Sequence, residues 1–576
     1  MNKLRWQLLL VGLALVAIAI LLLAQQPVLQ TFTAQPERGG IYIEGLVGTI
    51  GRLNPLLDDA NPADQDITRL LFNGLVRFDG RGNPLPDLAE TWGVSLDGLQ
   101  YNVKLREGLI WHDGEPLTTA DVAYTVELLK DPSLPIREDV RTLWESVEVF
   151  VFDDLHMQFW LPSAYAPFMD YLSFGVLPQH LLGEMDAATL MNAPYNLEPV
   201  GSGPYRFGEL LNENNQVTGV VLNAWDGYYA GRPYIDQVVF HYYETAEDAY
   251  QAYQGGDLLG INYIDPQLLS TVLSDPTLNV YSTRLPSLSL VLLNLKNPEK
   301  PFFQETQVRQ ALMYGTNRQW IVDQFLGGQG IVADSPILPG SWAYNEAQPS
   351  IPYDADIAIS LLKQAGYTIP AEGGQVRSKE GISLELELVH PDDALHTQIA
   401  ESIRDDWAQI GVQATLLAVP YEQLISDYLE PRAYQAALVD LDFAHEPDPD
   451  PYPFWHQAEA TGGQNYSMWD DRRASEYLEL ARAFPGFSTN QSQRARLYHN
   501  FQAHFAREIP AILLYIPIYN YAISSQVRGV SVGPIFQSSD RFATINEWFL
   551  VARSQVEELD PTAQPEIGDT TATGMP

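Results

Sequence analysis

The segment from residue 86 to residue 132 places its hydrophobic and polar positions in two different periods. Residues 100–105 alternate between polar and apolar side chains, which predicts a half-buried strand. A short loop with one large aromatic, Trp-His-Asp-Gly-Glu-Pro, occupies residues 111–116. Thr119 then precedes apolar positions at helical spacing between residues 122 and 129, so we expect it to cap a helix. The pattern predicts a strand, a tight loop and a capped helix in that order.

The same mixture of short strands and helices continues along the chain from residue 41 to residue 550. No solenoid period and no low-complexity block interrupts this region. Strands that alternate with helices predict an α/β fold with more than one domain for a chain of 576 residues.

The beginning of the chain, residues 1–24, predicts a transmembrane segment. Lys3 and Arg5 precede an uncharged, apolar run, and the small residues expected at a cleavage site are poorly placed. We interpret the segment as an uncleaved signal anchor in preference to a cleaved signal peptide, with everything after it exported. Residues 25–40 are expected to form a polar tether, and residues 553–576 a disordered acidic tail.

The amino-acid composition excludes several classes of functional site and of binding partner. The chain has no cysteine, which excludes disulfides, thiolate metal sites, a cysteine nucleophile and a lipidated N-terminal cysteine. Its formal charge of −40 would repel phosphate backbones, so we expect no nucleic-acid partner. An acidic solvated surface explains this charge adequately, although the same charge could also attract cationic ligands. No phosphate loop, dinucleotide fingerprint or nucleophile elbow is present, so we expect no catalytic residues and no cofactor.

Further motifs occur in a fixed order along nearly the whole chain. They are Asn54-Pro55-Leu56 and the segments 71–75, 200–207, 308–322, 353–367, 407–412 and 496–527. Each motif is weakly specific alone, but the ordered set is much more specific. Together with the segment at residues 86–132, it resembles family-5 solute-binding proteins, the extracytoplasmic receptors of peptide- and nickel-type ABC transporters.

This resemblance implies a bilobal α/β architecture of the periplasmic-binding-protein type (class II, cluster C), with an extra domain. It implies a discontinuous domain I (41–70, 200–290 and 511–552), a domain II (71–199) and a domain III (291–510). The chain would cross between the lobes at a hinge near Gly203 and Pro510.

The loop at residues 440–451 concentrates carboxylates between prolines. Its prolines and its lack of a suitably placed glycine argue against a calcium loop, and Pro449 stands where a zinc motif would need its second histidine. In peptide-binding relatives this loop carries an acid that pairs with the ligand's α-amino group. The resemblance places His445 at that position, with Asp442 and Glu446 as the nearest carboxylates. The amine anchor would then be absent or dependent on pH, and a solvated acidic loop remains the alternative.

Other ligand-binding candidates follow from their position in the family motifs. They lie in the loop after the first strand, in a helix of domain II, at the ends of strands of domain I, and in the segment where the chain last crosses between the lobes. The full set of ligand-binding candidates is Asn61, Ala63, Asp64, Trp144, Glu244, Asn262, Tyr263, Asp442, His445, Glu446 and Tyr521. Ordinary packing is the competing interpretation for each of them.

These observations predict the substrate-binding component of an ABC importer, anchored to the cell membrane with its domains outside the cytoplasm. It would bind a peptide-like or other small polar solute between its lobes, act as a monomer, and deliver the solute to permease and ATPase subunits. A membrane-anchored sensor with the same fold and no transport role is the alternative. A secreted hydrolase is disfavoured, because no nucleophile and base stand at motif spacing.

Overall fold

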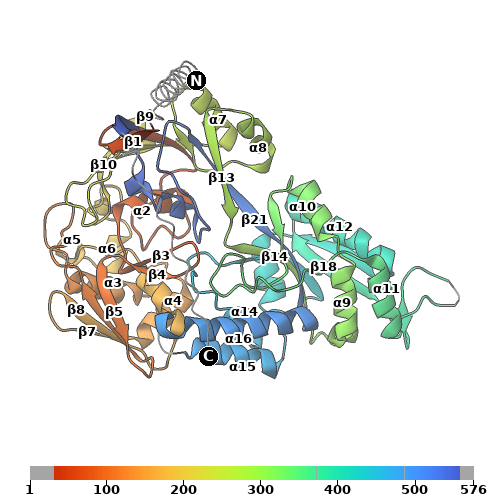
Figure 1. Ribbon diagram of the computed structural model, residues 1–576. Coiled ribbons are helices and arrows are strands. Elements are labelled where there is room, and N and C mark those ends of the chain that lie inside the picture. Colours follow the sequence, from red (N-terminus) through yellow and green to blue (C-terminus); the bar gives the residue numbers. More distant parts are fainter. Residues whose placement is uncertain (1–30, 372, 485–486, 558–576) are drawn as a thin grey trace, which may run out of the picture.

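The computed structural model describes residues 31–371, 373–484 and 487–557. The predicted anchor at residues 1–24 and most of the predicted acidic tail lie outside these described residues. Within them, no helix combines the length and the apolar character that crossing a membrane requires. The described chain forms two lobes side by side, joined by one long strand, β21 (Ala511–Ser524) (Figure 1).

Lobe 1 is built on a mixed sheet in which the strand order is β9-β10-β11-β2-β12-β21, with β13 also paired to β21. Strands β11 and β12 both run parallel to β2, so the carboxyl ends of these three strands lie at one edge of the sheet. The elements of this part are β2 (Ile41–Val47), α2 (Pro62–Leu71), β9 (Tyr205–Glu213), β10 (Gln216–Ala224), β11 (Gln237–Tyr243), α7 (Ala246–Gly255), β12 (Gly260–Ile261), α8 (Pro266–Leu273) and β13 (Leu278–Arg284).

A second, antiparallel sheet of order β5-β6-β8-β7 belongs to the same lobe. Its strand β6 occupies residues Gln100–Leu105, as the alternating pattern predicted. Helix α3 follows the aromatic loop, but Thr118 is its N-cap and Thr119 its first residue. The elements here are β3 (Val76–Phe78), β4 (Pro84–Pro86), β5 (Ala89–Val94), β6, α3 (Thr119–Leu129), α4 (Glu138–Ser146), β7 (Glu148–Val151), β8 (His156–Trp160), α5 (Gln179–Leu182) and α6 (Ala187–Leu190).

Lobe 2 is built on a sheet of order β19-β18-β20-β14-β21, in which β18 runs parallel to β19 and β20. Helices pack on this sheet around a large apolar core. Its strands are β14 (Ser287–Leu293), β15 (Gly330–Val332), β16 (Ser378–Lys379), β17 (Ile382–Ser383), β18 (Glu385–Pro391), β19 (Gln413–Val419) and β20 (Ala436–Asp442). Its helices are α9 (Thr306–Tyr314), α10 (Arg318–Phe325), α11 (Ala355–Gln364), α12 (Ala394–Ile410), α13 (Tyr421–Gln423), α14 (Tyr452–Trp455), α15 (Arg472–Arg482) and α16 (Phe487–Glu508).

The chain passes between the lobes at places that differ from the predicted hinge. The first residues of β21 pair with β14 in lobe 2, and residues 518–524 pair with β13 in lobe 1, so the crossing lies several residues beyond Pro510. The other crossing joins β13 to β14, where Leu285 N donates to Pro517 O at 2.8 Å. Gly203 is not at a crossing, because its N–H donates to Leu71 O at 2.8 Å within lobe 1.

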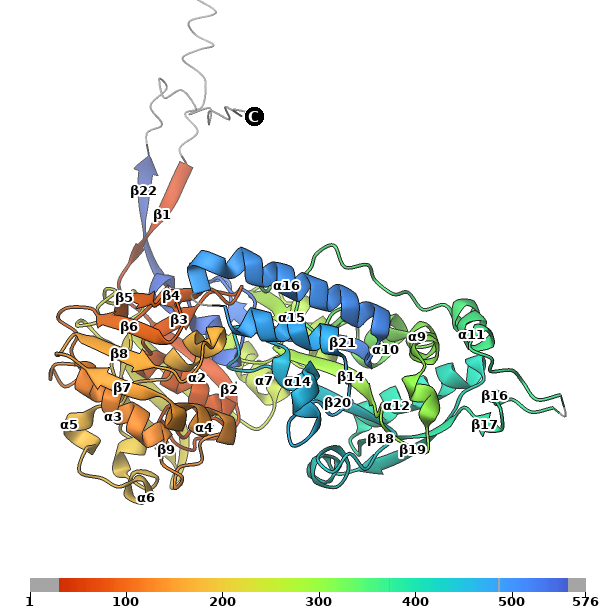
Figure 2. The same ribbon diagram turned by 90° about the horizontal axis from the view of Figure 1, so that it is seen from below.

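A two-stranded antiparallel ribbon projects from lobe 1, formed by β1 (Thr31–Glu37) and β22 (Val551–Glu557) (Figure 2). It brings segments from the two ends of the described chain side by side.

A buried ionic cluster holds the core of lobe 1 together. The guanidinium of Arg541 bonds Glu44 on β2 at 3.0 Å through Nε, and Asp66 on α2 at 2.8 Å through Nη2. All three side chains are fully buried, and Tyr42 donates to the same glutamate. Because each charge is paired and hydrogen-bonded, the cluster ties sheet, helix and C-terminal segment to one another.

Candidate functional site

The carboxyl edges of the two parallel sets of strands face each other across the boundary between the lobes. The loop after β2 belongs to lobe 1 and the loop after β20, residues 443–451, belongs to lobe 2. His445 Nε2 lies 3.6 Å from Asp59 Oδ1, which connects these two loops directly. In open α/β sheets, ligands bind in the crevice outside the carboxyl ends of the strands. The boundary between the lobes at these two loops is therefore the candidate site, and we call it the interlobe crevice.

The backbone at His445 has a conformation that non-glycine residues rarely adopt, with φ of 62°. Hydrogen bonds on both sides hold it there: Phe443 N donates to Pro286 O, and His445 N donates to Phe536 O of lobe 1 at 3.3 Å. Strained conformations of this kind persist only where the surroundings fix them, and they concentrate at binding sites. The turn directs the imidazole toward lobe 1.

Glu446 carries the second ionic contact between the lobes. Its carboxylate lies 3.6 Å from Arg137, which is the N-cap of α4 and also bonds both oxygens of Asp139. Burial in the crevice raises the pKa of Glu446 to about 7, although the positive charge of Arg137 opposes that rise. A third of the Glu446 side chain stays exposed, so it can still exchange its partner for a ligand group.

Asp448 anchors the loop instead of facing the crevice. It accepts two hydrogen bonds from the fully buried Arg494 of α16, at 2.7 and 2.8 Å. Its own N–H donates to Asp170 of lobe 1 at 2.9 Å. Burial and the adjacent charge of Asp448 raise the pKa of Asp170. The loop is therefore fastened at its far end, and residues 442–446 are its part nearest the crevice.

Gly82 of lobe 1 lets the β3–β4 turn reach this loop. Its φ is 84°, and a Cβ at this position would lie 2.2 Å from Pro447 O. A side chain there would force the two lobes apart, so glycine is required for this close approach.

The loop after β2 is shaped by two of the predicted residues. Asn61 is the N-cap of α2, and its side chain donates to Thr49 O at 2.9 Å. Asp64 accepts hydrogen bonds from Gly51 N at 3.0 Å and Arg52 N at 2.6 Å. Asp64 is 1% exposed, and Ala63 is also buried. These residues position the loop that carries Asp59 and leave little side-chain surface for a ligand.

Asn262, Tyr263 and Glu244 follow strands β12 and β11 at the same sheet edge. Asn262 is buried, with its Oδ1 accepting from Val47 N at 3.0 Å. Tyr263 is 36% exposed and stacks on Tyr519, with ring centroids 6.4 Å apart. Glu244 is exposed at the end of β11. Tyr263 and Glu244 therefore keep side-chain surface that a ligand can reach.

Two aromatic predictions are wrong, because both side chains are core residues. Trp144 is 1% exposed and packs edge-on against Phe159, Phe168 and Phe174. Tyr521 is fully buried, where it hydrogen-bonds the hydroxyl of Tyr42.

Sequence reasoning did not select four residues that meet at this crevice. They are Asp59, Arg137, Phe536 and Asp540. Asp540 is among the acids whose charge acts on His445, and it organises its own turn by accepting from Phe536 N at 2.9 Å. Asp59 had a local signal, because it stands in the same loop as Asn61 and Asp64. Arg137 had none, because its contact partner is about 300 residues away in the sequence.

The charge on the crevice is mainly negative. Asp59, Asp442 and Asp540 act on His445 together with the opposing charge of Arg137, yet burial dominates and lowers the pKa of the imidazole. Behind them, burial also raises the pKa of Asp58 to about 7, against a hydrogen bond from Thr68. Within the described part of the chain, no three histidine or carboxylate side chains are arranged to hold a metal ion.

Known proteins match this chain along most of its length. The family described as bacterial extracellular solute-binding proteins, family 5 Middle, matches residues 83–464, which is more than half of the chain. The oligopeptide-binding protein AppA of Bacillus subtilis is 27% identical over 529 residues, covering 90% of this chain and 92% of that protein. The dipeptide-binding protein of Escherichia coli is 27% identical over 491 residues, covering 81% and 87%.

The solved structure of AppA from Bacillus subtilis in complex with a nonapeptide has the same fold. It aligns with a TM-score of 0.65 and 25% identity, covering 90% of this chain and 100% of that one. The bilobal architecture and the family resemblance inferred from the sequence are thereby confirmed. The chain belongs to the family-5 bacterial extracellular solute-binding proteins.

Proposed function

We propose that this protein is the substrate-binding component of an ABC importer and captures a peptide-like solute in the interlobe crevice. The observation that carries the proposal is the meeting of the two carboxyl edges, where His445 faces Asp59 and Glu446 faces Arg137. Both contacts join one lobe to the other, so a ligand that replaces them would act on both lobes at once. The peptide-binding relatives support the choice of solute class.

The charges favour a solute that carries a positively charged amine. Asp59 and Asp442 are exposed carboxylates at the crevice, whereas Arg137 is already engaged by Asp139 and Glu446. A charge-assisted hydrogen bond from an ammonium group to one of these carboxylates would be stronger than a neutral one. His445 would be displaced from Asp59 when such a ligand enters. The proposal therefore places the ligand amine close to the His445–Asp59 contact.

Ligand binding would close the two lobes, because the ligand has a higher affinity for the closed form than for the open form. A ligand that bonds groups of both lobes binds the closed form more tightly than the open form and shifts the population toward it. Motion would occur where the chain crosses between β13 and β14 and within β21.

The test begins with the purified protein and mass spectrometry of any small molecule that co-purifies with it. Calorimetric titration with peptides of two to nine residues, each with a free or an acetylated N-terminus, then measures affinity. Loss of one charge-assisted bond corresponds to about 10-fold or more in affinity, so acetylation should weaken binding by at least that factor. Small-angle scattering should show compaction with the free peptides.

Matched variants test which carboxylates bind the amine of the peptide. Asp59→Asn and Asp442→Asn should weaken binding of the free peptides, whereas Glu476→Gln, an exposed carboxylate on α15, should leave it unchanged. If no peptide binds and no small molecule co-purifies, the proposal fails. If free and acetylated peptides bind equally, the crevice binds peptides by other groups and the amine contact is wrong.

We also propose that residues 1–24 anchor the protein to the cell membrane and that the closed form delivers its solute to permease and ATPase subunits. The supporting sequence feature is the apolar run after Lys3 and Arg5. Intact-mass measurement of membrane-extracted protein tests the anchor. Recovery of soluble chains that begin between residues 25 and 40 would refute it.

A further inference from the structure

Lobe 1 contains a cavity of about 600 Å³ that is separate from the interlobe crevice. Its walls come from α2, the start of β3, the loop before β5, the loop at residues 228–234 and the segment at residues 542–547. No wall residue belongs to lobe 2, so closure of the lobes neither forms nor closes this space. The volume is within the range of sites for small molecules.

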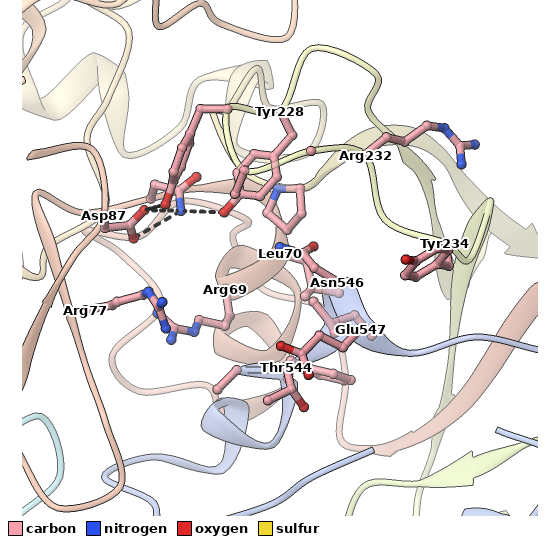
Figure 3. Close-up of a pocket in the computed structure, with 18 of the residues that line it drawn as sticks. Arg69, Leu70, Arg77, Asp87, Tyr228, Arg232, Tyr234, Thr544, Asn546 and Glu547 are labelled. Atoms are coloured by element: carbon pink, nitrogen blue, oxygen red, sulfur yellow. Dashed lines mark hydrogen bonds between the residues drawn. The ribbon is translucent and has the colours of Figure 1, made fainter. Parts of the chain in front are cut away.

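Arginines dominate the charge of this cavity. Figure 3 shows Arg69 and Arg77 with their guanidinium groups pointing toward one another. Arg69 lies 3.7 Å from Asp540, which is a long contact. The Arg77 side chain makes no hydrogen bond or ion pair with any residue that the structure describes, although its charge acts on Asp87. Two guanidinium groups that face one another repel, and an anion between them would remove that repulsion.

Asp87 of the cavity lining is already engaged by other residues. Asp87 is 2% exposed and accepts hydrogen bonds from Asn73 Nδ2 at 2.9 Å and from the Tyr229 hydroxyl at 2.6 Å. Burial raises its pKa, although the charges of Arg69 and Arg77 act in the opposite direction. In contrast, Arg232 on the far wall is paired with two carboxylates. Arg77 therefore remains available to an anion from outside, and Arg69 has only the long contact with Asp540 to give up.

Two amide oxygens of the cavity lining lack partners. Asn73 is 9% exposed, and its Oδ1 is buried without a hydrogen bond, while its Nδ2 is fixed by Asp87. Asn546 Oδ1 is likewise buried without a partner. Buried acceptors without donors are uncommon in folded proteins and call for an explanation. A hydrogen-bond donor from a ligand that reached these two oxygens would satisfy them.

We propose that this cavity is a second binding site, for a small hydroxylated organic anion. A carboxylate or phosphate of the ligand would bridge Arg69 and Arg77, and its hydroxyl groups would donate to Asn73 and Asn546. Tyr228, which also lines the cavity, offers an aromatic face to the carbon skeleton. The protein as a whole has a charge of −40 and repels anions, so binding depends on this local pair of arginines.

Citrate and tricarballylate are suitable probes, because they have the same three carboxylates and only citrate has a hydroxyl. Calorimetric titration of the purified full-length protein should detect citrate binding, with tricarballylate several-fold weaker. Spermidine, a trivalent cation, should not bind here. Arg77→Gln should weaken citrate binding about 10-fold, since it removes a charge-assisted contact from a side chain that has no structural partner.

Further variants distinguish citrate binding in this cavity from citrate binding elsewhere on the protein. Arg404→Gln removes an exposed arginine of α12 in lobe 2 and should leave citrate binding unchanged. Citrate has a single hydroxyl proton to donate, so either Asn546→Ala or Asn73→Ala should abolish the difference between citrate and tricarballylate while both still bind. Thermal unfolding of each variant verifies that it is folded, and peptide affinity at the crevice should not change with Arg77→Gln.

The inference is wrong if citrate does not bind, or if Arg77→Gln and Arg404→Gln bind it equally well. Because Arg69 contacts Asp540, which also acts on His445, citrate can alter affinity at the crevice. The inference is also wrong if citrate and a crevice ligand exclude one another completely, as two ligands of one site would. Equal affinity for citrate and tricarballylate in the unchanged protein would overturn the assignment of Asn73 and Asn546 as acceptors for a ligand hydroxyl.

Discussion

The imidazole Nε2 of His445 lies 3.6 Å from the Asp59 carboxylate, and this contact joins the loop after β20 to the loop after β2. The two residues are nearly 400 positions apart in the sequence. Both side chains stay substantially exposed, so a ligand can reach each of them when the lobes separate. The contact therefore exists only when the two loops are together, and its loss would accompany opening of the lobes.

Removing this contact should loosen the closed form without unfolding the protein. Even a charged contact between exposed side chains contributes only about 0–1 kcal/mol, and lowering of the His445 pKa leaves the imidazole mostly neutral near pH 7. Asp59→Asn should therefore shift the open and closed populations by at most a few-fold in the absence of ligand. The radius of gyration from small-angle scattering measures the shift. Glu476→Gln is the matched exposed control and should not alter it. A radius that Asp59→Asn leaves unchanged would show that the contact does not help to hold the lobes together.

Closure should also depend on pH in a way that separates Glu446 from His445. In the crevice the pKa of Glu446 rises from its ordinary value of 4.5 to about 7, so the closed form takes up a proton between these values. Closure is therefore favoured as the pH falls from about 7 toward 4.5. Solvent screening of its exposed third should keep the effect to a few-fold.

His445 should act in the opposite direction. Burial lowers its pKa below the ordinary 6.5, so the closed form releases a proton and closure is disfavoured as the pH falls below that value. In the Glu446→Gln variant, closure should keep only the pH dependence that comes from His445. In the His445→Gln variant, closure should keep only the pH dependence that comes from Glu446. Scattering of the ligand-free variants from pH 4.5 to 8 measures both. Identical profiles for the two variants would contradict these assignments.

The buried cluster around Arg541 should be essential for folding. Arg541→Met would leave Glu44 and Asp66 buried without their common partner, and such losses cost about 3–5 kcal/mol. Urea unfolding should show that loss in the free energy of unfolding. Arg404→Met removes an exposed pair on α12 and should change it by less than about 1 kcal/mol. A similar small loss for both variants would mean that the cluster is not a stabilising element.

Local patterns in the sequence predicted local structure well. The alternation at residues 100–105 predicted β6, and the helical spacing after it predicted α3, with the cap displaced by one residue to Thr118. Whether an aromatic is exposed depends on distant partners, however. Tyr521 is buried because Tyr42, 479 positions away, supplies its hydrogen bond, and no local pattern contains that information. For the same reason Arg137, whose partner Glu446 is about 300 positions away, could not be selected from sequence.

The assignment of Trp144 to the core of lobe 1 can be tested directly. Trp144→Ala removes a buried side chain that contacts three phenylalanines, so it should cost about 3–5 kcal/mol of stability. At a temperature where the variant is still folded, its affinity for a crevice ligand should equal that of the unchanged protein. Urea unfolding and calorimetric titration measure the two quantities. Weaker binding by a fully folded variant would return this residue to the ligand site.

Gly203 offers the last prediction, because a packing role and a hinge role give different results. A Cβ at Gly203 would lie 2.3 Å from Leu70 O, inside lobe 1. Gly203→Ala should therefore lower stability by about 1–3 kcal/mol through overpacking, while ligand-dependent compaction keeps its amplitude. Gly93→Ala is the control, since a Cβ there meets nothing within 4 Å. If Gly203→Ala is as stable as Gly93→Ala but no longer compacts with ligand, Gly203 is part of the hinge after all.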